Sequence, residues 1–436
     1  MLEDEEIIEI LNDWNFWSRE QNTGIVRNEY LSCLRKLSGT KEIIDVTGVR
    51  RCGKSTILKQ LIKDMISKGA KKEKMLYVNF EEVQFEPELS LQFLQRVYLA
   101  YQKYVNRAEE SCIFLDEIQN IPKWEKWVRT IYDKHDGKIK VFVSGSSANL
   151  LRSELSSTLT GRHITLEIYP LSFKEFLSFK GMDITSKQGA ILRSKQIRML
   201  FVDYLEKGGF PEAVLRDDAA TLLGQYFDDI VYRDVAERHK IREINIVRSI
   251  AIYLFTNTSK YFTYNKIKNS LPSKPSLETV IKYIDYLESA FLVFSVPIYS
   301  YKTMEQLRQP RKVYCIDTGM RNAICFRFRE NLGQLAENCV YLELRRRKKE
   351  VYYWKDRYNE VDFVIKEGMK PSELIQVCWN LKDKSTRDRE VKGLLKGMSE
   401  FGLDRGLIIS EDYEGTETIG KKKIVYVALW KWMLGF

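Results

Sequence analysis

A glycine-rich stretch near residue 50 has the residue types and spacing needed to hold phosphate. Gly48, Gly53, Lys54 and Ser55 satisfy the pattern GxxxxGK[ST]. Glycines let successive backbone N–H groups face phosphate oxygens, and a helix that starts there adds positive potential. The lysine can reach the β- and γ-phosphates of ATP, and the serine hydroxyl can ligate Mg²⁺. The nucleotide-binding candidates are Gly48, Val49, Arg50, Arg51, Cys52, Gly53, Lys54, Ser55 and Thr56, with Asn79 as a further candidate.

Two adjacent carboxylates follow an apolar run at residues 112–115. At the tip of a strand beside the phosphate loop, Asp116 can hold Mg²⁺ through water, and Glu117 can act as the general base for the attacking water. Asn79 ends another predicted strand and could hydrogen-bond Glu117 until a partner binds. The alternative for the carboxylates is a strand with solvated acidic ends.

Two further side chains could sense or stabilise the γ-phosphate. Ser146 follows a strand, although a helix cap at Ser146 or Ser147 is an equal alternative. Arg162 follows a glycine turn and could reach the γ-phosphate in its own or a neighbouring subunit. Its alternative is an ordinary surface arginine.

The elements around these residues predict an α/β fold with a parallel sheet covered on both faces. The expected strands are residues 42–47, 74–80, 112–115 and 140–144, and the expected helices are 55–68 and 89–105. The glycine loop thus follows a strand and opens a helix, as its motif requires.

Later segments predict further domains. A helical lid is expected over 171–243, and helices at 246–255, 264–271 and 277–290 followed by a strand at 291–299 outline a winged helix. Beyond 301 we expect a basic helix at 334–349 and strands at 350–354, 361–365 and 373–379. The predicted domains are an N-terminal helical segment 1–24, an ATPase core 25–170, a lid or connector 171–243, a winged helix 244–300 and an α/β domain 301–436.

Composition narrows the class of protein. Lys and Arg total 70 against 60 acidic residues, a net charge of +10 that is compatible with nucleic acid as a partner. Seven scattered cysteines without a CxxC pair, and only three histidines, argue against zinc and fit a reducing compartment. The acidic N-terminus and the lack of a long apolar run lead us to expect a cytoplasmic protein without a membrane segment.

The runs GVRRCGKST, FLDEIQNIPKWEKWVR, FVSGSSANLL and LTGRHITLEIYPLSFKEF resemble AAA-type ATPases of the archaeal and bacterial "archaeal ATPase" group. These are similar to replication initiators and signalling ATPases. GGFPEAV, YFDDIVYRDVAERHKIR and ENCVYLELRRR resemble the C-terminal domains of such proteins. The resemblance implies a P-loop AAA-type sheet with a helical lid, then a winged helix, then a PD-(D/E)xK nuclease-like domain.

A nuclease of that type needs carboxylates for Mg²⁺ and a lysine that activates water. The resemblance implies Glu337 or Glu343, with Asp362, as ligands of a second metal site. The expected (D/E)xK is Gln376-Val377-Cys378 here, so cleavage is in doubt. Three lysines could take the missing role: Lys355, Lys366 and Lys382. The basic run 345–349 could instead bind nucleic acid, or form a solvated helix end.

Three functions follow from these features. In the first, ATP binding and hydrolysis control contact with duplex or branched DNA, partly through Lys274 and Lys282 of the winged helix. In the second, the nucleotide sets the oligomeric state of a signalling or defence switch that binds a protein partner. The third is an ATP-regulated nuclease. A homo-oligomer is compatible with each.

Overall fold

The computed structural model describes residues 2–436, apart from residues 109, 136, 147–158, 160 and 327–331. The chain forms two compact units, Met1–Ile168 and Tyr169–Phe436. Among the helices within the described ranges, none has the length and apolar character needed to cross a membrane.

A five-stranded parallel sheet forms the centre of the first unit, with strand order β2-β3-β4-β1-β5. Its strands are β1 (Ile43–Thr47), β2 (Met75–Asn79), β3 (Ser111–Asp116), β4 (Ile139–Gly145) and β5 (His163–Glu167). Every residue of β1, β3 and β4 is buried, as expected for a parallel sheet covered on both faces. The predicted α/β class and its four strands are confirmed, and β5 is an edge strand that the prediction missed.

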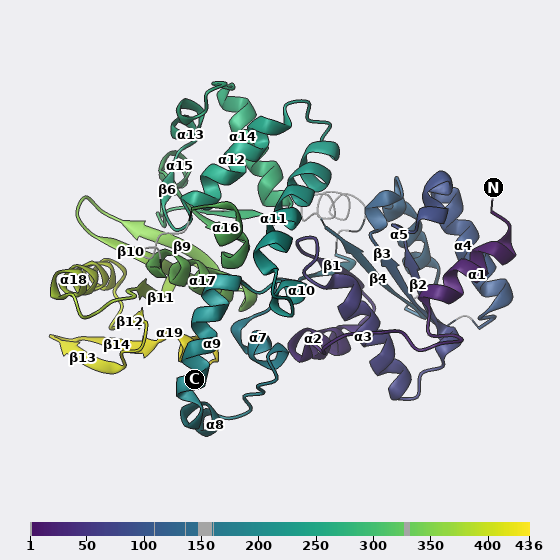
Figure 1. The fold of residues 1–436 in the computed structure, drawn as a ribbon, viewed down its shortest axis with the longest axis horizontal. Coiled ribbons are helices and arrows are strands. Elements are labelled where there is room, and N and C mark those ends of the chain that lie inside the picture. Colours follow the sequence, from purple (N-terminus) through teal and green to yellow (C-terminus); the bar gives the residue numbers. More distant parts are fainter. Residues whose placement is uncertain (1, 109, 136, 147–158, 160, 327–331) are drawn as a thin grey trace. The chain divides into compact units, whose positions relative to one another are not determined.

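Helices cover both faces of this sheet (Figure 1). They are α1 (Asp4–Trp14), α2 (Asn28–Ser38), α3 (Lys54–Ser67), α4 (Leu91–Tyr104) and α5 (Trp124–His135). Residues of α1, α4 and α5 share one hydrophobic core with the strands, including the buried Leu11, Tyr101 and Trp124. Since the strands are parallel, their carboxyl ends meet at one edge, where Asn79 aligns with Asp116 and Thr47 with Gly145.

The second unit begins with helices. They are α7 (Phe173–Phe179), α8 (Lys187–Leu192), α9 (Ser194–Lys207), α10 (Pro211–Val214), α11 (Ala219–Asp229) and the π-helix η4 (Ile230–Glu237). A tight turn at Gly208 and Gly209 packs on Asp317, the N-cap of α16 (Thr318–Ile324). A Cβ on Gly208 would lie 2.0 Å from Asp317 Oδ1, so only glycine fits there.

A three-stranded antiparallel sheet with three helices follows along the chain. The helices are α12 (Ile244–Thr256), α13 (Tyr264–Ser270) and α14 (Leu277–Ser289), and the strands are β6 (Tyr261–Phe262), β7 (Val293–Val296) and β8 (Arg311–Cys315). Between β7 and β8 lies α15 (Thr303–Arg308). The strand order is β6-β8-β7, so this sheet contains residues on both sides of the predicted boundary at residue 300.

A six-stranded mixed sheet with the order β13-β14-β12-β11-β10-β9 completes the second unit. Its strands are β9 (Glu350–Lys355), β10 (Glu360–Glu367), β11 (Lys370–Val377), β12 (Arg405–Ser410), β13 (Gly415–Ile419) and β14 (Lys422–Ala428). The accompanying helices are α17 (Leu332–Arg346), α18 (Lys384–Phe401) and α19 (Leu429–Met433). Its core packs α18 on the sheet through Leu394 and Met398, against Val361 and Leu374.

Candidate active site

The phosphate loop joins the end of β1 to the start of α3. Gly48 packs so closely on the chain after β5 that a Cβ there would lie 2.1 Å from the carbonyl oxygen of Ile168. Gly53, directly before α3, has φ +101°, which residues other than glycine rarely adopt. The two glycines of the motif are therefore required by the local backbone, and Lys54 and Ser55 open the helix.

Lys54 turns its ammonium back over this loop. Its Nζ donates to the carbonyl oxygens of Gly48 at 3.0 Å and Val49 at 3.2 Å, and lies 3.8 Å from Glu117 Oε1. The side chain is only 4% exposed. A charged amine held over the start of a helix is suited to bind phosphate oxygens.

Asp116, at the end of β3, is buried and surrounded by hydroxyl groups. Tyr77 donates to its Oδ2 at 2.5 Å, and Ser144 of β4 donates to its Oδ1. Burial raises the pKa of Asp116, and the neighbouring Glu117 charge raises it further, whereas hydrogen bonds from Ser144, Ser55 and Tyr77 lower it. The Ser55 hydroxyl and the Asp116 carboxylate are therefore adjacent oxygen donors, the kind of ligand that Mg²⁺ prefers.

Glu117 is the first residue after β3 and has a left-handed φ of +53°. Its N–H donates to Ser144 Oγ at 3.2 Å, and its Oε2 accepts from Gln119 Nε2 at 2.5 Å. The amide oxygen of Asn79 instead accepts from the Glu81 N–H at 3.0 Å. The predicted hydrogen bond between Asn79 and Glu117 is thus absent from the described part of the chain, and Gln119 holds the glutamate.

The remaining loop residues differ in their surroundings. Val49 and Cys52 are buried, Arg51 is exposed, and Arg50 donates to Glu81 Oε1 at 2.6 and 2.7 Å. Thr56 is exposed on the first turn of α3. Burial is the main cause that raises the pKa of the Cys52 thiol, so this cysteine is a packing residue of the loop.

A support that the sequence prediction missed comes from the segment before α2. The buried Arg27 donates from Nη1 to the Cys52 carbonyl at 2.8 Å, and its N–H donates to Gln60 Oε1 at 3.2 Å. Gln60 in turn donates to the carbonyls of Thr23 and Ile25, both at 2.8 Å. Arg27 and Gln60 thus join residues 23–27 to the phosphate loop and α3, and no local pattern in the sequence marks them.

Arg162 lies away from the phosphate loop of its own chain. Its carbonyl accepts from the N–H of Ile43, at the beginning of β1, whereas the loop follows the end of that strand. Its Nε lies 3.3 Å from Asp133 Oδ1. The alternative in which Arg162 reaches the γ-phosphate in its own subunit does not fit this geometry, and the alternative in a neighbouring subunit stays a prediction.

The two serines at the end of β4 have different surroundings. Ser144 contacts both Asp116 and Glu117, whereas Ser146 is a buried residue just beyond the strand. The sequence prediction chose Ser146 and missed Ser144. The register of β3 and β4 places Ser144 beside Asp116, because Leu115 aligns with Val143 one residue earlier in each strand. Ser147, the alternative helix cap, lies outside the described residues.

Comparison with known proteins shows the family to which this chain belongs. A family model described as an AAA domain matches residues 40–177, and two domains of unknown function, DUF8612 and DUF4143, match residues 198–332 and 332–432. The uncharacterized protein MJ1544 of Methanocaldococcus jannaschii is 36% identical over 409 residues, which cover 90% of this chain and 88% of that protein. The chain belongs to the same family as MJ1544.

Members of this family occur in archaea and bacteria. An uncharacterized protein of Haemophilus influenzae is 32% identical over 413 residues, covering 93% of this chain and 98% of that protein. A solved structure of C. elegans PCH-2 aligns with 60% of this chain and 66% of that one, at 14% identity and a TM-score of 0.26. The AAA domain and the five-stranded parallel sheet together identify the first unit of this family member as a P-loop ATPase domain.

The second metal site predicted for this family member does not assemble as expected. Glu337 of α17 and Asp362 of β10 approach one point, but Glu343 instead contacts Arg346 at 3.5 Å and Arg347 at 2.9 Å. No His, Cys, Asp or Glu side chains among the residues that the structure describes form a group arranged to hold a metal ion. Burial, and then the charge of Asp362, raise the pKa of Glu337, whereas the charge of Lys312 and the hydrogen bond from Tyr314 lower it.

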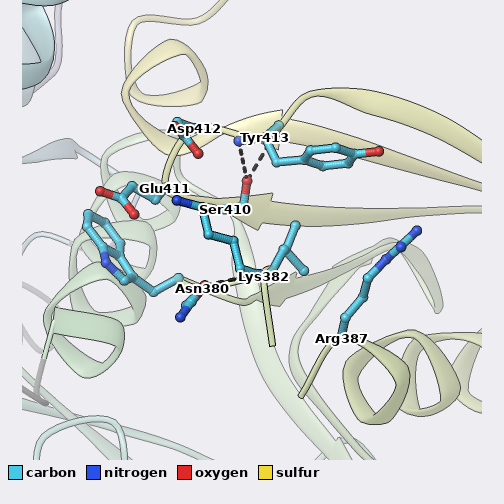
Figure 2. A pocket seen from close by; sticks show the side chains of 9 residues that line it. Asn380, Lys382, Arg387, Ser410, Glu411, Asp412 and Tyr413 are labelled. Atoms are coloured by element: carbon cyan, nitrogen blue, oxygen red, sulfur yellow. Dashed lines mark hydrogen bonds between the residues drawn. The ribbon is translucent and has the colours of Figure 1, made fainter. Parts of the chain in front are cut away.

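None of the three lysines proposed for that site reaches it. Lys366 contacts Glu350 at 2.9 Å, and Lys355 lies 4.6 Å from the centre of the Tyr261 ring. Lys382 lines a cavity of about 130 Å³ at the carboxyl ends of β11 and β12 (Figure 2). A lysine that the prediction did not consider, Lys312 of β8, contacts the carboxylates instead.

The sequence predicts that the basic run 345–349 could bind nucleic acid, but three of its arginines form hydrogen bonds within the chain. Arg345 donates to the Tyr169 hydroxyl at 3.3 Å, and Arg346 donates to the carbonyls of Pro170 at 3.0 Å and Leu171 at 3.2 Å. Arg347 donates to the Trp432 carbonyl at 2.8 Å. These arginines therefore join the C-terminal end of α17 to residues 169–171 and to Trp432 of the same unit.

Proposed function

We propose that this protein is a Mg²⁺-dependent ATPase whose nucleotide state controls contact of its C-terminal region with DNA. The observation that carries the ATPase part is the convergence of Lys54, Ser55, Asp116 and Glu117 at one edge of the parallel sheet. In this proposal Lys54 binds the β- and γ-phosphates, while Ser55 and Asp116 hold the metal ion. When bound, Mg²⁺ neutralises charge that develops on the phosphate oxygens.

Glu117 is the proposed general base. Its Oε1 lies 3.8 Å from Lys54 Nζ, and Gln119 orients the carboxylate by donating to Oε2. In this proposal Lys54 turns from Glu117 and the loop carbonyls to phosphate oxygens when ATP binds, because those oxygens carry more charge than a carbonyl. The freed Glu117 Oε1 then accepts a proton from the attacking water.

The proposal for DNA contact rests on the module of α12, α13 and α14. Three helices with a small sheet of order β6-β8-β7 support the interpretation as a winged helix. Lys282 is exposed on α14 and Lys274 is exposed just before it, and both could contact phosphates with α14 in the major groove. Glu278 and Asp285, which are exposed on the same helix, predict that binding is weak. The lysine contacts to phosphate predict that it is salt-dependent.

A second candidate function is an ATP-dependent switch that acts on a protein partner. Ile191 and Leu192 of α8, and Met199 and Val202 of α9, are exposed apolar side chains on neighbouring helices. Surfaces of this kind favour protein contacts over DNA contacts. In this version a homo-oligomer forms in the ATP state, and Arg162 of one subunit serves the site of the next.

The two candidates are separated by ATP turnover with duplex or branched DNA at 50 and 200 mM salt. DNA control predicts stimulation at low salt that falls steeply at high salt, and that is lost when Lys274 and Lys282 are both changed to Glu. Lys71→Glu with Lys72→Glu is a control for the same charge change, because both lysines are exposed before β2 in the first unit, outside this module. Turnover that ignores DNA, together with a change in molecular mass on ATP binding, would favour the protein-partnered switch.

A further inference from the structure

A buried lysine lies at the centre of the carboxylate cluster in the second unit. Lys312 is only 2% exposed, and its Nζ lies 2.7 Å from Asp362 Oδ1, 2.7 Å from Glu360 Oε1 and 3.1 Å from Glu337 Oε1. The lysine comes from β8 of the three-stranded sheet, and its partners come from β10 and α17. One side chain therefore links two sheets and a helix.

Hydrogen bonds fix the carboxylates around this ammonium. The Tyr314 hydroxyl donates to Glu337 Oε1 at 2.7 Å, and the Val377 N–H donates to Asp362 Oδ2 at 3.0 Å. Gln376, which stands where the nuclease pattern has an acid, accepts from the Asp362 N–H at 3.1 Å and donates to Glu390. An ammonium has three protons, and each of them has one carboxylate within reach.

The charge balance of the cluster also depends on Lys312. Burial alone lowers the pKa of Lys312, but the charges of Asp362 and Glu337 outweigh burial and raise the pKa well above its ordinary value. The three oxygen contacts and the direction of this shift both favour the charged form of the side chain. A buried charge of this kind is stable only when it is paired and hydrogen-bonded.

The position of Nζ leaves no place for the metal ion of a nuclease-like site. Mg²⁺ needs an octahedron of oxygens at about 2.0–2.1 Å, and the point that the three carboxylates share is occupied by Nζ. A dication placed beside the ammonium would also be repelled by it. The residues present do not fit a metal ion.

We infer that the Lys312 ammonium occupies the cation position of this cluster in place of a divalent metal ion. The cluster is then a metal-independent network of ion pairs, here called the ion-pair lock, that holds β8 against β10 and α17. The domain then binds no Mg²⁺ at Asp362 and cleaves no phosphodiester. Its carboxylates, which resemble nuclease ligands, serve to hold the three-stranded and six-stranded sheets together. This inference does not depend on the proposed ATPase or on DNA contact.

The lock is tested first by unfolding of the full chain. Lys312→Met removes the ammonium and leaves the buried carboxylates without their cation, so the thermal midpoint should fall by roughly 5 to 15 °C. Lys355→Met is the matched control, because Lys355 is exposed and lies over the same Tyr261 ring; its midpoint should stay within about 2 °C. Adding Asp362→Asn to Lys312→Met should restore part of the loss. An unchanged midpoint for Lys312→Met would overturn the lock.

The metal test uses protein with Lys312 intact, so it stands even if Lys312→Met fails to fold. In a full chain carrying Ser55→Ala and Asp116→Asn, which weakens the ATP-site metal, Mn²⁺ uptake is followed by electron paramagnetic resonance without nucleotide. We expect no stoichiometric uptake that depends on Asp362, and equal unfolding midpoints in Mn²⁺ and in EDTA. One equivalent of bound Mn²⁺ that Asp362→Asn abolishes would overturn the inference.

Discussion

The hydroxyl of Tyr77 donates a 2.5 Å hydrogen bond to Oδ2 of Asp116, across the β2–β3 pair. Asp116 is 1% exposed, so each hydroxyl that bonds it favours the ionised form that a metal ion needs. Removing a donor from a buried carboxylate is costly, on the order of 1–3 kcal/mol. Tyr77 is thus a positioning residue for the proposed magnesium ligand.

Tyr77→Phe should therefore raise the Mg²⁺ concentration that half-saturates ATP turnover, by roughly tenfold. The variant raises the pKa of Asp116 further, so protons compete better with the metal and the effect should be larger at pH 6 than at pH 8. Tyr101→Phe is the control, since the Tyr101 hydroxyl bonds the Glu73 carbonyl instead. An unchanged Mg²⁺ requirement at both pH values would remove Tyr77 from this role.

Alanine variants of Ser144 and Ser146 can be compared to identify which serine supports the general base Glu117. Ser144→Ala removes the donor to Asp116 and the acceptor of the Glu117 N–H, so kcat should fall by at least about tenfold. Ser146→Ala should have the smaller effect. If Ser146→Ala lowers kcat more than Ser144→Ala does, Ser146 would be favoured as the residue that contacts the γ-phosphate.

Arg162 is expected to act on the site of a neighbouring subunit. Arg162→Ala and Glu117→Gln should each lose turnover, roughly 10³-fold for a γ-phosphate arginine, and mixing the two proteins should restore part of it. Arg129→Ala is a control, because Arg129 also contacts Asp133, with Nε 3.4 Å from Oδ2. The absence of rescue at every mixing ratio would argue against a role in trans.

Asp317 predicts a pH dependence of stability in the second unit. Burial is the main cause that raises its pKa from 3.8 to about 6, although the N–H groups of Gly209 and Met320 donate to it at 2.7 and 2.8 Å. The folded state then holds a proton that the unfolded state releases between about pH 4 and 6, so stability falls as pH rises through that window. Relative to Asp317→Asn, the wild type should lose about 2 kcal/mol from pH 4 to 7 in urea unfolding. A difference that is constant with pH would contradict this.

The phosphate loop and its carboxylates could be predicted because their chemistry is local. Eight consecutive residues contain the loop pattern, and the apolar run before Asp116 marks a buried strand without reference to the rest of the chain. The edge strand β5 was missed because only Leu166 of its five residues is fully buried, so it shows little of the apolar character of the central strands.

The carboxylate cluster of the second unit could not be predicted in the same way. Lys312 lies 25 residues from Glu337 and 50 from Asp362 in the sequence, and in the sequence alone the segment around Arg311 and Lys312 has the character of a basic surface. Its burial results from the pairing of β8 with β7 and β6 and the packing of that sheet near β10. Only the tertiary structure brings these residues together.

The most direct test of the central claim measures ATP binding and turnover in wild type, Lys54→Ala and Glu117→Gln. The wild type should hydrolyse ATP in a Mg²⁺-dependent reaction, and Glu117→Gln should bind ATP normally while turnover falls by about 10² to 10⁴-fold. Lys54→Ala should lose binding. Turnover that persists in Glu117→Gln, or normal ATP affinity in Lys54→Ala, would contradict the assignment of this site.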